Sequence, residues 1–456
     1  MINAAPLAMF LTTFIALIAG YPVALTLAGV ALIFALIGTI FGIFNPSDLG
    51  FTAGRLFGLV TNQTLIAIPL FVFMGVTLEK TKIAESLLSD LSSLFGRSRS
   101  GLATTVILVG ALMAASTGIV GATVVTMSLM ALPVMLKAGY DARLATGTIS
   151  ATGTLGQIIP PSIALVLLGD VLSNSYQQAQ LNQGIFAPKS VSVGDLFAGA
   201  IVPGLCLVIL YLIYVYTNIL LSKSKIDSKQ ASDQKFNIFS LLASLAPPLL
   251  LIFAVLGSII LGYATPTEAA GIGAAGAILI GIVKKRLEFS TIKAISESTL
   301  STTGMVFFIL IGASIFSLVF RGFGGDEQIQ GFFDAMPGGV TTALVLVMIV
   351  IFLLGFILDF IEITFVVVPI VGPVLLAMGV DPIWLGVVIA INLQTSFLTP
   401  PFGFALFYLR GVAPSCVETK DIYLGALPFV GLQILILVLL FIYPSIATWL
   451  PTRLYG

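Results

Sequence analysis

The sequence predicts an all-α polytopic membrane protein, arranged as an inverted repeat with two re-entrant hairpins and two helices broken by Pro-Pro pairs. Three observations support this prediction. Of the 456 residues, 58% are hydrophobic and only 9% are charged, whereas soluble globular domains carry about 25% charged residues. Long apolar runs recur along the whole chain. The pairs Pro160-Pro161 and Pro400-Pro401 interrupt two of these runs.

A spanning helix needs about 20 predominantly apolar residues. Eight runs meet or approach that length, and no basic segment of the signal-peptide kind precedes the first of them. Two amphipathic segments with charged faces, 79–99 and 284–298, are predicted to lie at the membrane interface as arms. The eight predicted spans lie at about 6–19, 22–44, 62–78, 195–221, 238–262, 265–283, 299–319 and 421–446.

Two further segments, 101–137 and 340–378, are apolar but have small or polar residues at their centres, near 116–121 and 359–364. Each arm is short for a membrane crossing, so we expect both segments to be re-entrant helical hairpins. Non-helical backbone at that depth is tolerated where protein or a water-filled cavity covers it.

Each hairpin is followed by a helix that a Pro-Pro pair breaks, at 141–172 and at 382–409. Pro160 and Pro400 are 240 positions apart, and the same shift carries Gly139 onto Gly379. These coincidences predict an internal duplication. The two repeats would occupy 1–222 and 238–456, joined by a cytoplasmic linker at 223–237.

Lysine and arginine orient the chain, because cytoplasmic loops carry an excess of both. If segment 79–100 lies on the cytoplasmic side of the membrane, sixteen of the 20 basic residues lie on that side. The first hairpin then enters from the cytoplasm and the second from outside, so the two repeats are predicted to be inverted. The basic residues left outside are Arg55, Lys189, Arg321 and Arg453.

The two breaks predict binding sites. A proline in a spanning helix removes an amide donor and leaves carbonyl groups without helical partners. Buried carbonyls without partners are costly, and a sodium ion supplies what they lack. Half-helices whose N-termini face a break attract carboxylates. Inverted repeats with broken helices near the midplane are typical of secondary transporters.

Small residues and oxygen donors surround both breaks, which suits a hard monovalent cation. The alternative interpretation is that such residues only let helices approach closely. Asp359 and Glu362 are ionisable groups at depth, and are therefore functional candidates. Glu268, at the start of a span, is predicted to be a structural helix cap.

Composition excludes several function classes. The chain has no histidine, which removes histidine-based catalysis and zinc–histidine sites. No enzyme activity and no organic cofactor are expected. The net charge is zero, so no global field attracts nucleic acid.

Three segments resemble the large membrane subunit of TRAP transporters, the tripartite ATP-independent periplasmic carriers, known as the DctM family. They are GYATPTEAAGIG at 262–273, the glycine- and threonine-rich hairpin core at 110–123, and GYDARLATGTISATGTLGQIIPPSIAL at 139–165. The outer stretch 171–204 is longer than in many members and resembles the mannitol/chloroaromatic-type branch. Its loop, 173–194, would either dock a binding protein or act as a solvated spacer.

The resemblance implies an elevator-type importer of organic acids, coupled to sodium ions and embedded in the lipid of the bacterial inner membrane. Its partners would be a small four-helix membrane subunit (DctQ-like) and a periplasmic substrate-binding protein (DctP-like). Carried over by motif, one sodium site would comprise Ser116, Thr117, Thr154, Gly156 and Pro160. The other would comprise Asp359, Thr364, Ser396, Thr399 and Pro400. Substrate would lie between the hairpin tips, at Thr117, Gly118, Thr123, Thr364 and Thr395.

Two rival functions stay open at this point. A stand-alone sodium- or proton-coupled anion carrier of related fold would need no binding protein, so its uptake would survive deletion of that protein. A proton-translocating subunit of a membrane enzyme complex would need a relay of ionisable residues in mid-span, and the predicted spans contain few acids and no histidine.

Overall fold

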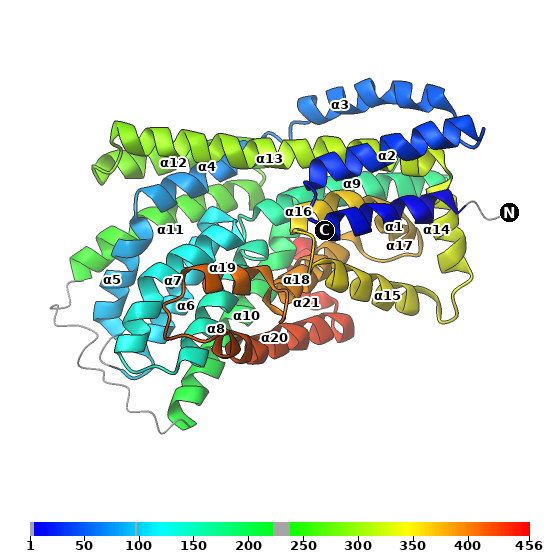
Figure 1. Cartoon of the computed structure of the whole chain (residues 1–456). Helices are drawn as coiled ribbons and strands as arrows, with labels where there is room; N and C mark the ends of the chain where they lie inside the picture. Colours follow the sequence, from blue (N-terminus) through cyan, green and yellow to red (C-terminus); the bar gives the residue numbers. More distant parts are fainter. Residues whose placement is uncertain (1–3, 96–97, 222–237) are drawn as a thin grey trace. The chain divides into compact units, whose positions relative to one another are not determined.

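The computed structural model describes residues 4–95, 98–221 and 238–456, so the predicted linker at 223–237 lies outside the described residues. The described residues form helices and no strand, which confirms the predicted all-α class. Figure 1 shows the course of the chain. The chain packs into two compact units, each built from three segments that alternate along the sequence. Unit 1 comprises Met1–Ile66, Leu167–Ser192 and Leu300–Gly386. Unit 2 comprises Ala67–Val166, Val193–Thr299 and Val387–Gly456.

Unit 1 holds the N-terminal helices and the second predicted hairpin. Its helices are α1 (Ala5–Ile18), α2 (Val23–Ile40), the short η1 (Pro46–Gly50), α3 (Phe51–Thr61), α14 (Gly325–Asp334), α15 (Gly339–Leu354), α16 (Phe360–Glu362), the π-helical η3 (Ile363–Val367) and α17 (Val368–Ala377).

Unit 2 holds the first predicted hairpin and both Pro-Pro pairs. Its helices are α4 (Ala67–Lys80), α5 (Ile83–Phe95), α6 (Gly101–Thr117), α7 (Val120–Lys137), α8 (Ala142–Thr154), the 3₁₀ turn η2 (Leu155–Gln157), α10 (Val193–Leu221), α11 (Ile238–Ile260), α12 (Pro266–Val283), α19 (Phe404–Val412), α20 (Thr419–Ile442) and α21 (Ser445–Tyr455). Three helices contribute residues to both units, namely α9 (Ile163–Asn182), α13 (Phe289–Gly322) and α18 (Pro382–Leu398).

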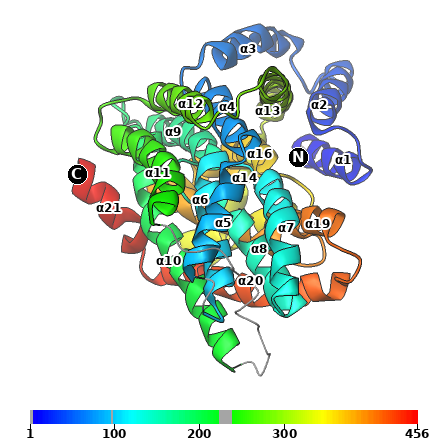
Figure 2. The same cartoon turned by 90° about the vertical axis from the view of Figure 1, so that its left-hand side faces the viewer.

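Small residues set the closest packing in unit 2. A Cβ at Gly147 of α8 would lie 2.0 Å from the carbonyl oxygen of Gly425 on α20, so the two backbones touch. Arg143 also pairs with Asp421 across the same two helices, at 3.0 Å. The broken helix is therefore fixed to α20 along its first half. Figure 2 shows the neighbouring group of α4, α11 and α12.

Eight helices in the described part are long and apolar enough to cross a membrane, which supports a multi-pass membrane protein. The eight differ in part from those predicted. The predicted spans 6–19 and 62–78 correspond to α1 and α4, which have only 14 residues each. Conversely, the second arms of both hairpins, Val120–Lys137 and Phe360–Ala377, reach 18 residues and are longer than expected.

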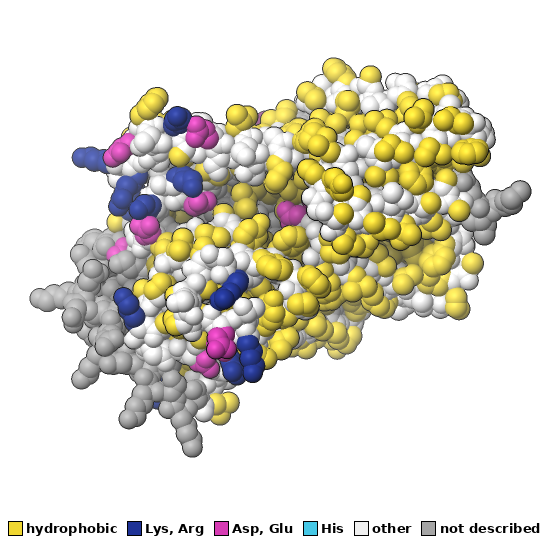
Figure 3. Space-filling view, viewed as in Figure 1, with side chains coloured by type: hydrophobic (Ala, Val, Ile, Leu, Met, Phe, Trp, Pro, Cys, Tyr) yellow, Lys and Arg dark blue, Asp and Glu magenta, His cyan; other side chains and the backbone are white. Residues whose placement is uncertain are grey.

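The surface formed by α1 and α2 is apolar. In unit 1, α1 and α2 expose large side chains such as Leu11, Ile15 and Leu36, and apolar atoms cover this part of the face in Figure 3. The lysine and arginine side chains visible on that face lie over elements of unit 2. An apolar surface of this kind suits contact with lipid.

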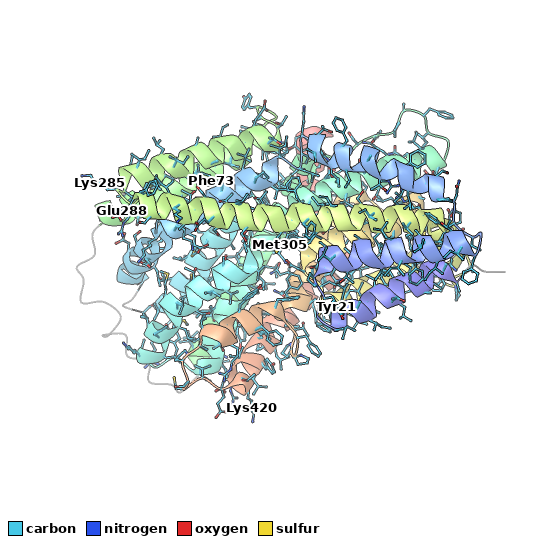
Figure 4. The ribbon with its side chains drawn as sticks, turned by 45° about the horizontal axis from the view of Figure 1, so that its top comes forward. Tyr21, Phe73, Lys285, Glu288, Met305 and Lys420 are labelled. Carbon is cyan, nitrogen blue, oxygen red and sulfur yellow. The ribbon has the colours of Figure 1, made fainter. Side chains whose placement is uncertain are left out.

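The predicted division between an interfacial arm at 284–298 and a span at 299–319 is wrong. A single helix, α13, runs without interruption from Phe289 to Gly322. Its first fifteen residues contain neither proline nor glycine, so nothing in the local sequence ends the helix where the polarity changes. The turn before it bears Lys285 and Glu288, which lie together at one end of α13 in Figure 4.

The predicted end of the first broken helix at 172 is also wrong. Helix α9 continues to Asn182, because residues 171–182 contain no proline or glycine. The non-helical part of the outer loop is therefore short, and begins only at Gln183.

Candidate functional site

The tip of the first hairpin is a glycine turn that rests on the start of α9. Helix α6 ends at Thr117, and Gly118 caps it in the left-handed conformation (φ 63°), which glycine adopts without strain. A Cβ at Gly118 would lie 3.3 Å from the backbone nitrogen of Ile163, the first residue of α9. The tip therefore contacts the N-terminus of the second half of the broken helix.

The first break lies beside the same tip. After η2 the chain leaves the helix and resumes it only at Ile163, and the Pro160–Pro161 peptide bond within this interval is cis. A Cβ at Gly156 would lie 3.0 Å from the carbonyl oxygen of Ala114, one turn before the tip. The first hairpin tip and the first break are therefore in contact at Gly118 and near Gly156, whereas the sodium site assigned to their residues stays a prediction.

Several polar atoms at this break have no protein partner. Within the described chain, the carbonyl groups of residues 158–161 accept no hydrogen bond. The side chain of Gln157 is 1% exposed, and neither of its amide atoms finds a partner among the described residues. Buried polar groups in this state are costly unless a ligand or water meets them. The buried polar atoms at the break are therefore available to bind a polar ligand.

The hydroxyl groups nearby are oriented as acceptors. Ser116 donates its proton to the carbonyl of Met113 at 2.9 Å, and Thr154 donates to that of Ala151 at 2.8 Å. Each hydroxyl has thereby committed its only proton, so any further hydrogen bond or metal contact must use its lone pairs. The side chain of Thr117 lies outside the described residues.

A buried hydrogen-bond network joins the first broken helix to α20 and α10. Gln433 of α20 donates to the hydroxyl of Tyr211 on α10 at 2.7 Å and to that of Thr154 on α8 at 3.4 Å. Gln394 of α18 lies beside the same tyrosine hydroxyl, although its amide atoms form no hydrogen bond within the described part. All four side chains are fully buried.

The second break, also in unit 2, repeats this arrangement. Helix α18 ends at Leu398, the Pro400–Pro401 peptide bond is cis, and α19 begins at Phe404. Thr395 and Thr399 each donate to the carbonyl four residues earlier, at 2.7 Å, and Ser396 is fully buried. Among the described residues the carbonyl of Leu398 accepts no hydrogen bond.

The tip of the second hairpin, in unit 1, is held by two acids. Asp359 is the N-cap of α16 and accepts from the backbone N–H of Phe360 at 2.7 Å. Glu362 in turn accepts from the backbone N–H of Asp359 at 2.8 Å. This reciprocal pair is a capping box. The same motif joins Thr265 and Glu268 at the start of α12, which confirms Glu268 as a helix cap.

Thr364 lies within the π-helical segment that follows this cap. Its side chain is 0% exposed, and its hydroxyl has no hydrogen-bond partner in the described residues. Single π-helical turns inside α-helices are frequent at functional sites. Thr364 is therefore the residue of this tip with the clearest structural sign of a ligand.

Thr123 and the residues of the second predicted sodium site are described next by the unit to which they belong. Thr123 is buried on α7 and donates to the carbonyl of Ile119 at 3.0 Å. Residues Asp359 and Thr364 belong to unit 1, whereas Ser396, Thr399 and Pro400 belong to unit 2. The second sodium site and the substrate site between the tips therefore stay predictions.

Sequence reasoning missed two members of the buried network, Tyr211 and Gln433. The signal available was a glutamine in the middle of the predicted span 421–446, since an isolated polar residue in such a span usually has a buried partner. Tyr211 carried no such signal, because tyrosine is common in apolar spans.

The sequence was compared with protein families and with known proteins. Residues 10–446 match the family model "Tripartite ATP-independent periplasmic transporter, DctM component". The chain is 29% identical to the C4-dicarboxylate TRAP transporter large permease protein DctM of Vibrio cholerae, with 96% of each chain covered. It is 27% identical to the sialic acid TRAP transporter large permease protein SiaM of the same organism, covering 96% of this chain and 97% of that one.

Two further comparisons extend the picture. The chain is 26% identical to the isethionate TRAP transporter permease protein DctMQ of Oleidesulfovibrio alaskensis, covering 94% of this chain and 64% of that longer one. Among solved structures, the YdaH transporter of Alcanivorax borkumensis superposes with a TM-score of 0.64 at 16% identity, covering 89% and 90% of the two chains. Neisseria gonorrhoeae MtrF gives a TM-score of 0.59 at 14% identity, covering 87% and 83%. These two likenesses concern the fold alone.

Proposed function

This chain belongs to the DctM family of tripartite ATP-independent periplasmic transporters, and on that premise we propose that it imports an organic acid by coupling to the sodium gradient. It is the large permease subunit, a multi-pass transport protein of the bacterial inner membrane and not an enzyme. Transport follows an elevator-type mechanism, in which the hairpins and broken helices move as one body.

The first break and hairpin tip carry the proposal for sodium. Ser116 and Thr154, whose hydroxyl protons are already donated, are assigned to this site by motif, and carbonyls 158–161 and Gln157 have no partner among the described residues. Gly156 and Pro160 shape the backbone that exposes these oxygens. Neutral oxygen donors suit a hard monovalent cation, and bound sodium would offset the cost of leaving them buried. Thr117 is assigned to this site by its position in the motif alone.

By motif, Asp359 and Thr364 at the tip and Ser396, Thr399 and Pro400 at the break are assigned to a second sodium site, and this assignment stays a prediction. Asp359 would supply one negative charge, which the first site lacks, so the two sites should differ in sodium affinity. The assignment of Gly118, Thr123, Thr364 and Thr395 to the substrate likewise rests on the motif alone. The N-terminus of α9, which meets the tip at Gly118, supplies partial positive charge for a carboxylate.

The substrate class rests on the relatives. Those compared are named for C4-dicarboxylates, sialic acid and isethionate, so an organic acid is the shared chemistry. Membership of the mannitol/chloroaromatic-type branch stays a prediction, because it rests only on the long stretch 171–204.

The partners follow from the tripartite family. We infer a small four-helix membrane subunit and a periplasmic substrate-binding protein. The longer relative named DctMQ supports the small subunit, because this chain covers only 64% of its length.

Uptake by the reconstituted complex tests this function. Proteoliposomes holding this chain, the small subunit and the binding protein are offered labelled lactate, pyruvate, glutamate and C4-dicarboxylates. We expect one of these acids to accumulate when an inward sodium gradient is imposed, and not with potassium in its place. Accumulation that does not depend on the sodium gradient contradicts the coupling. Uptake that survives without the binding protein favours a stand-alone carrier.

A further inference from the structure

A polar cleft of about 250 Å³ lies in unit 1 between α9, α14 and α17. One wall is the face of α14 that carries Asp326, Gln330 and Asp334, which follow one another at intervals of four residues. The other wall includes Gln178 and Asn182, also four residues apart on α9. The floor is formed by apolar side chains of α17. Two polar stripes thus face each other across an apolar base.

Hydrogen bonds fix the segments that surround the cleft. Gln183, at the end of α9, donates to the carbonyl of Ala377 at the end of α17 at 2.7 Å. Gln180 clamps the following loop through two 2.9 Å bonds to the backbone of Lys189. A Cβ at Gly372 of α17 would lie 3.3 Å from the hydroxyl of Ser175. The long α9 is therefore fixed against α17 along one side of the cleft.

Charge is distributed unevenly along the cleft. At one end Arg321 pairs with Asp326 at 3.2 Å and donates to Gln178 at 3.1 Å. Burial raises the pKa of Asp326, while Arg321 and Arg55 lower it. At the other end, about 12 Å further along α14, Asp334 forms no ion pair with any described residue. The open end is therefore negative.

These features select a ligand by its chemistry. A carboxylate at the open end attracts a cation and repels an organic acid, so the cleft is distinct from the proposed transport site. The amide side chains accept hydrogen bonds, and the apolar floor suits an alkyl stem. We propose that this cleft binds an alkylammonium or alkylguanidinium group, with its cationic head at Asp334 and its stem on α17.

The position of the cleft indicates where the ligand comes from. The charge pattern of the sequence assigns α14, the end of α9 and the end of α17 to the outside, and the structure brings these three segments together. The cation would therefore arrive from the periplasm, either as a free amine or as the lysine or arginine side chain of a docked protein.

Three probes with the same stem and different heads test the site on the purified full chain. They are butylammonium, butanamide and butanoate, measured by saturation-transfer NMR. We expect saturable binding of butylammonium, at least about threefold tighter than that of butanamide, and no binding of butanoate. Equal binding of all three, or tightest binding of butanoate, overturns the proposal.

Variants on α14 make the test specific. Asp334→Asn should weaken butylammonium binding about threefold, the loss expected for one ion pair at a solvent-exposed carboxylate. Glu327→Gln removes the same charge from the same helix, outside the cleft lining, and should leave binding unchanged. If both variants fold, as judged by size-exclusion profile and circular dichroism, and bind like the wild type, the assignment to this cleft is wrong.

Two larger probes distinguish the sources of the cation. Spermidine represents a free polyamine, and the amidated peptide Gly-Arg-Gly represents a protein side chain. Tighter binding of spermidine supports a free amine as the ligand, and tighter binding of the peptide supports a docked protein. Failure of both to compete with butylammonium contradicts the proposed chemistry. None of these measurements depends on transport, so their failure is distinguishable from failure of the proposed function.

Discussion

Thr364 has a fully buried hydroxyl without a partner among the described residues. A buried hydroxyl without a hydrogen bond lowers stability, so a residue kept only for packing should be improved by an apolar replacement of the same shape. If the hydroxyl binds sodium, its removal should instead weaken the effect of sodium on the protein. The two interpretations therefore predict different results for the same substitution.

We predict that Thr364→Val leaves stability without sodium unchanged, or raises it by up to about 1 kcal/mol. The same variant should need a higher sodium concentration for the rise in Tm that the wild type shows, because a ligand stabilises only the state that binds it. Thermal unfolding in sodium chloride and in potassium chloride measures both effects. Thr105→Val is the matched control, since Thr105 is equally buried and its hydroxyl also lacks a described partner. Equal sodium responses in both variants would contradict a role for Thr364.

The Tyr211–Gln433 hydrogen bond is the shortest link in the buried network, at 2.7 Å. We predict that Tyr211→Phe lowers the free energy of unfolding by about 1–2 kcal/mol, because the amide of Gln433 loses its better acceptor. Adding Gln433→Leu should cost less than the sum of the two single changes, because residues that share one bond are coupled. Equilibrium unfolding of the four proteins measures the coupling.

Tyr214 provides the control for this double-mutant comparison of Tyr211 and Gln433. Like Tyr211 it packs edge-to-face on Phe429, with ring centroids 5.0 Å apart against 5.1 Å. Its hydroxyl accepts from Asn218, however, and not from Gln433. Tyr214→Phe combined with Gln433→Leu should therefore be additive within about 0.5 kcal/mol. Coupling as large as that of Tyr211 would mean that the ring, and not the hydroxyl, carries the effect.

At the scale of elements, α8 and α20 depend on glycine for their close approach. A Cβ at Gly425 would lie 2.1 Å from the carbonyl oxygen of Arg143, which is backbone and cannot move aside cheaply. We predict that Gly425→Ala destabilises the protein by about 2–4 kcal/mol through overpacking. Gly431→Ala, on the same helix and with no atom within 4 Å of the new Cβ, should be neutral or stabilising by about 0.5–1 kcal/mol. Thermal unfolding of both variants checks this, and equal stabilities would show that the helices can separate without cost.

The sequence predicted these elements unequally, for physical reasons. Gly118 and the Pro-Pro pairs break helices by local backbone chemistry, so the first tip and both breaks were predictable from the sequence. The end of α9 and the continuity of α13 were not predicted, because a change from apolar to polar residues was taken for the end of a helix. Residues 289–303 and 171–182 contain no proline or glycine, so nothing in the local sequence ends the helix at that change.

At the scale of the whole molecule, the two repeats and the two compact units divide the chain differently. The repeats predicted from the 240-residue shift run in sequence order, whereas each unit takes segments from both halves. Matching elements do lie at the predicted shift: α7 and α17 end at Lys137 and Ala377, and α8 and α18 begin at Ala142 and Pro382. The network of Tyr211, Gln394 and Gln433 could not be predicted, because it depends on how four distant helices pack. Inversion of the repeats stays a prediction.

Direct binding of radioactive sodium to the purified chain tests the central claim, that oxygens exposed at the Pro-Pro breaks bind sodium. We predict saturable binding that unlabelled sodium displaces and potassium does not. The double variant Thr154→Val, Thr399→Val should bind markedly less, while Thr105→Val binds like the wild type. Absence of saturable binding to the folded chain, or unchanged binding by the folded double variant, would contradict the account.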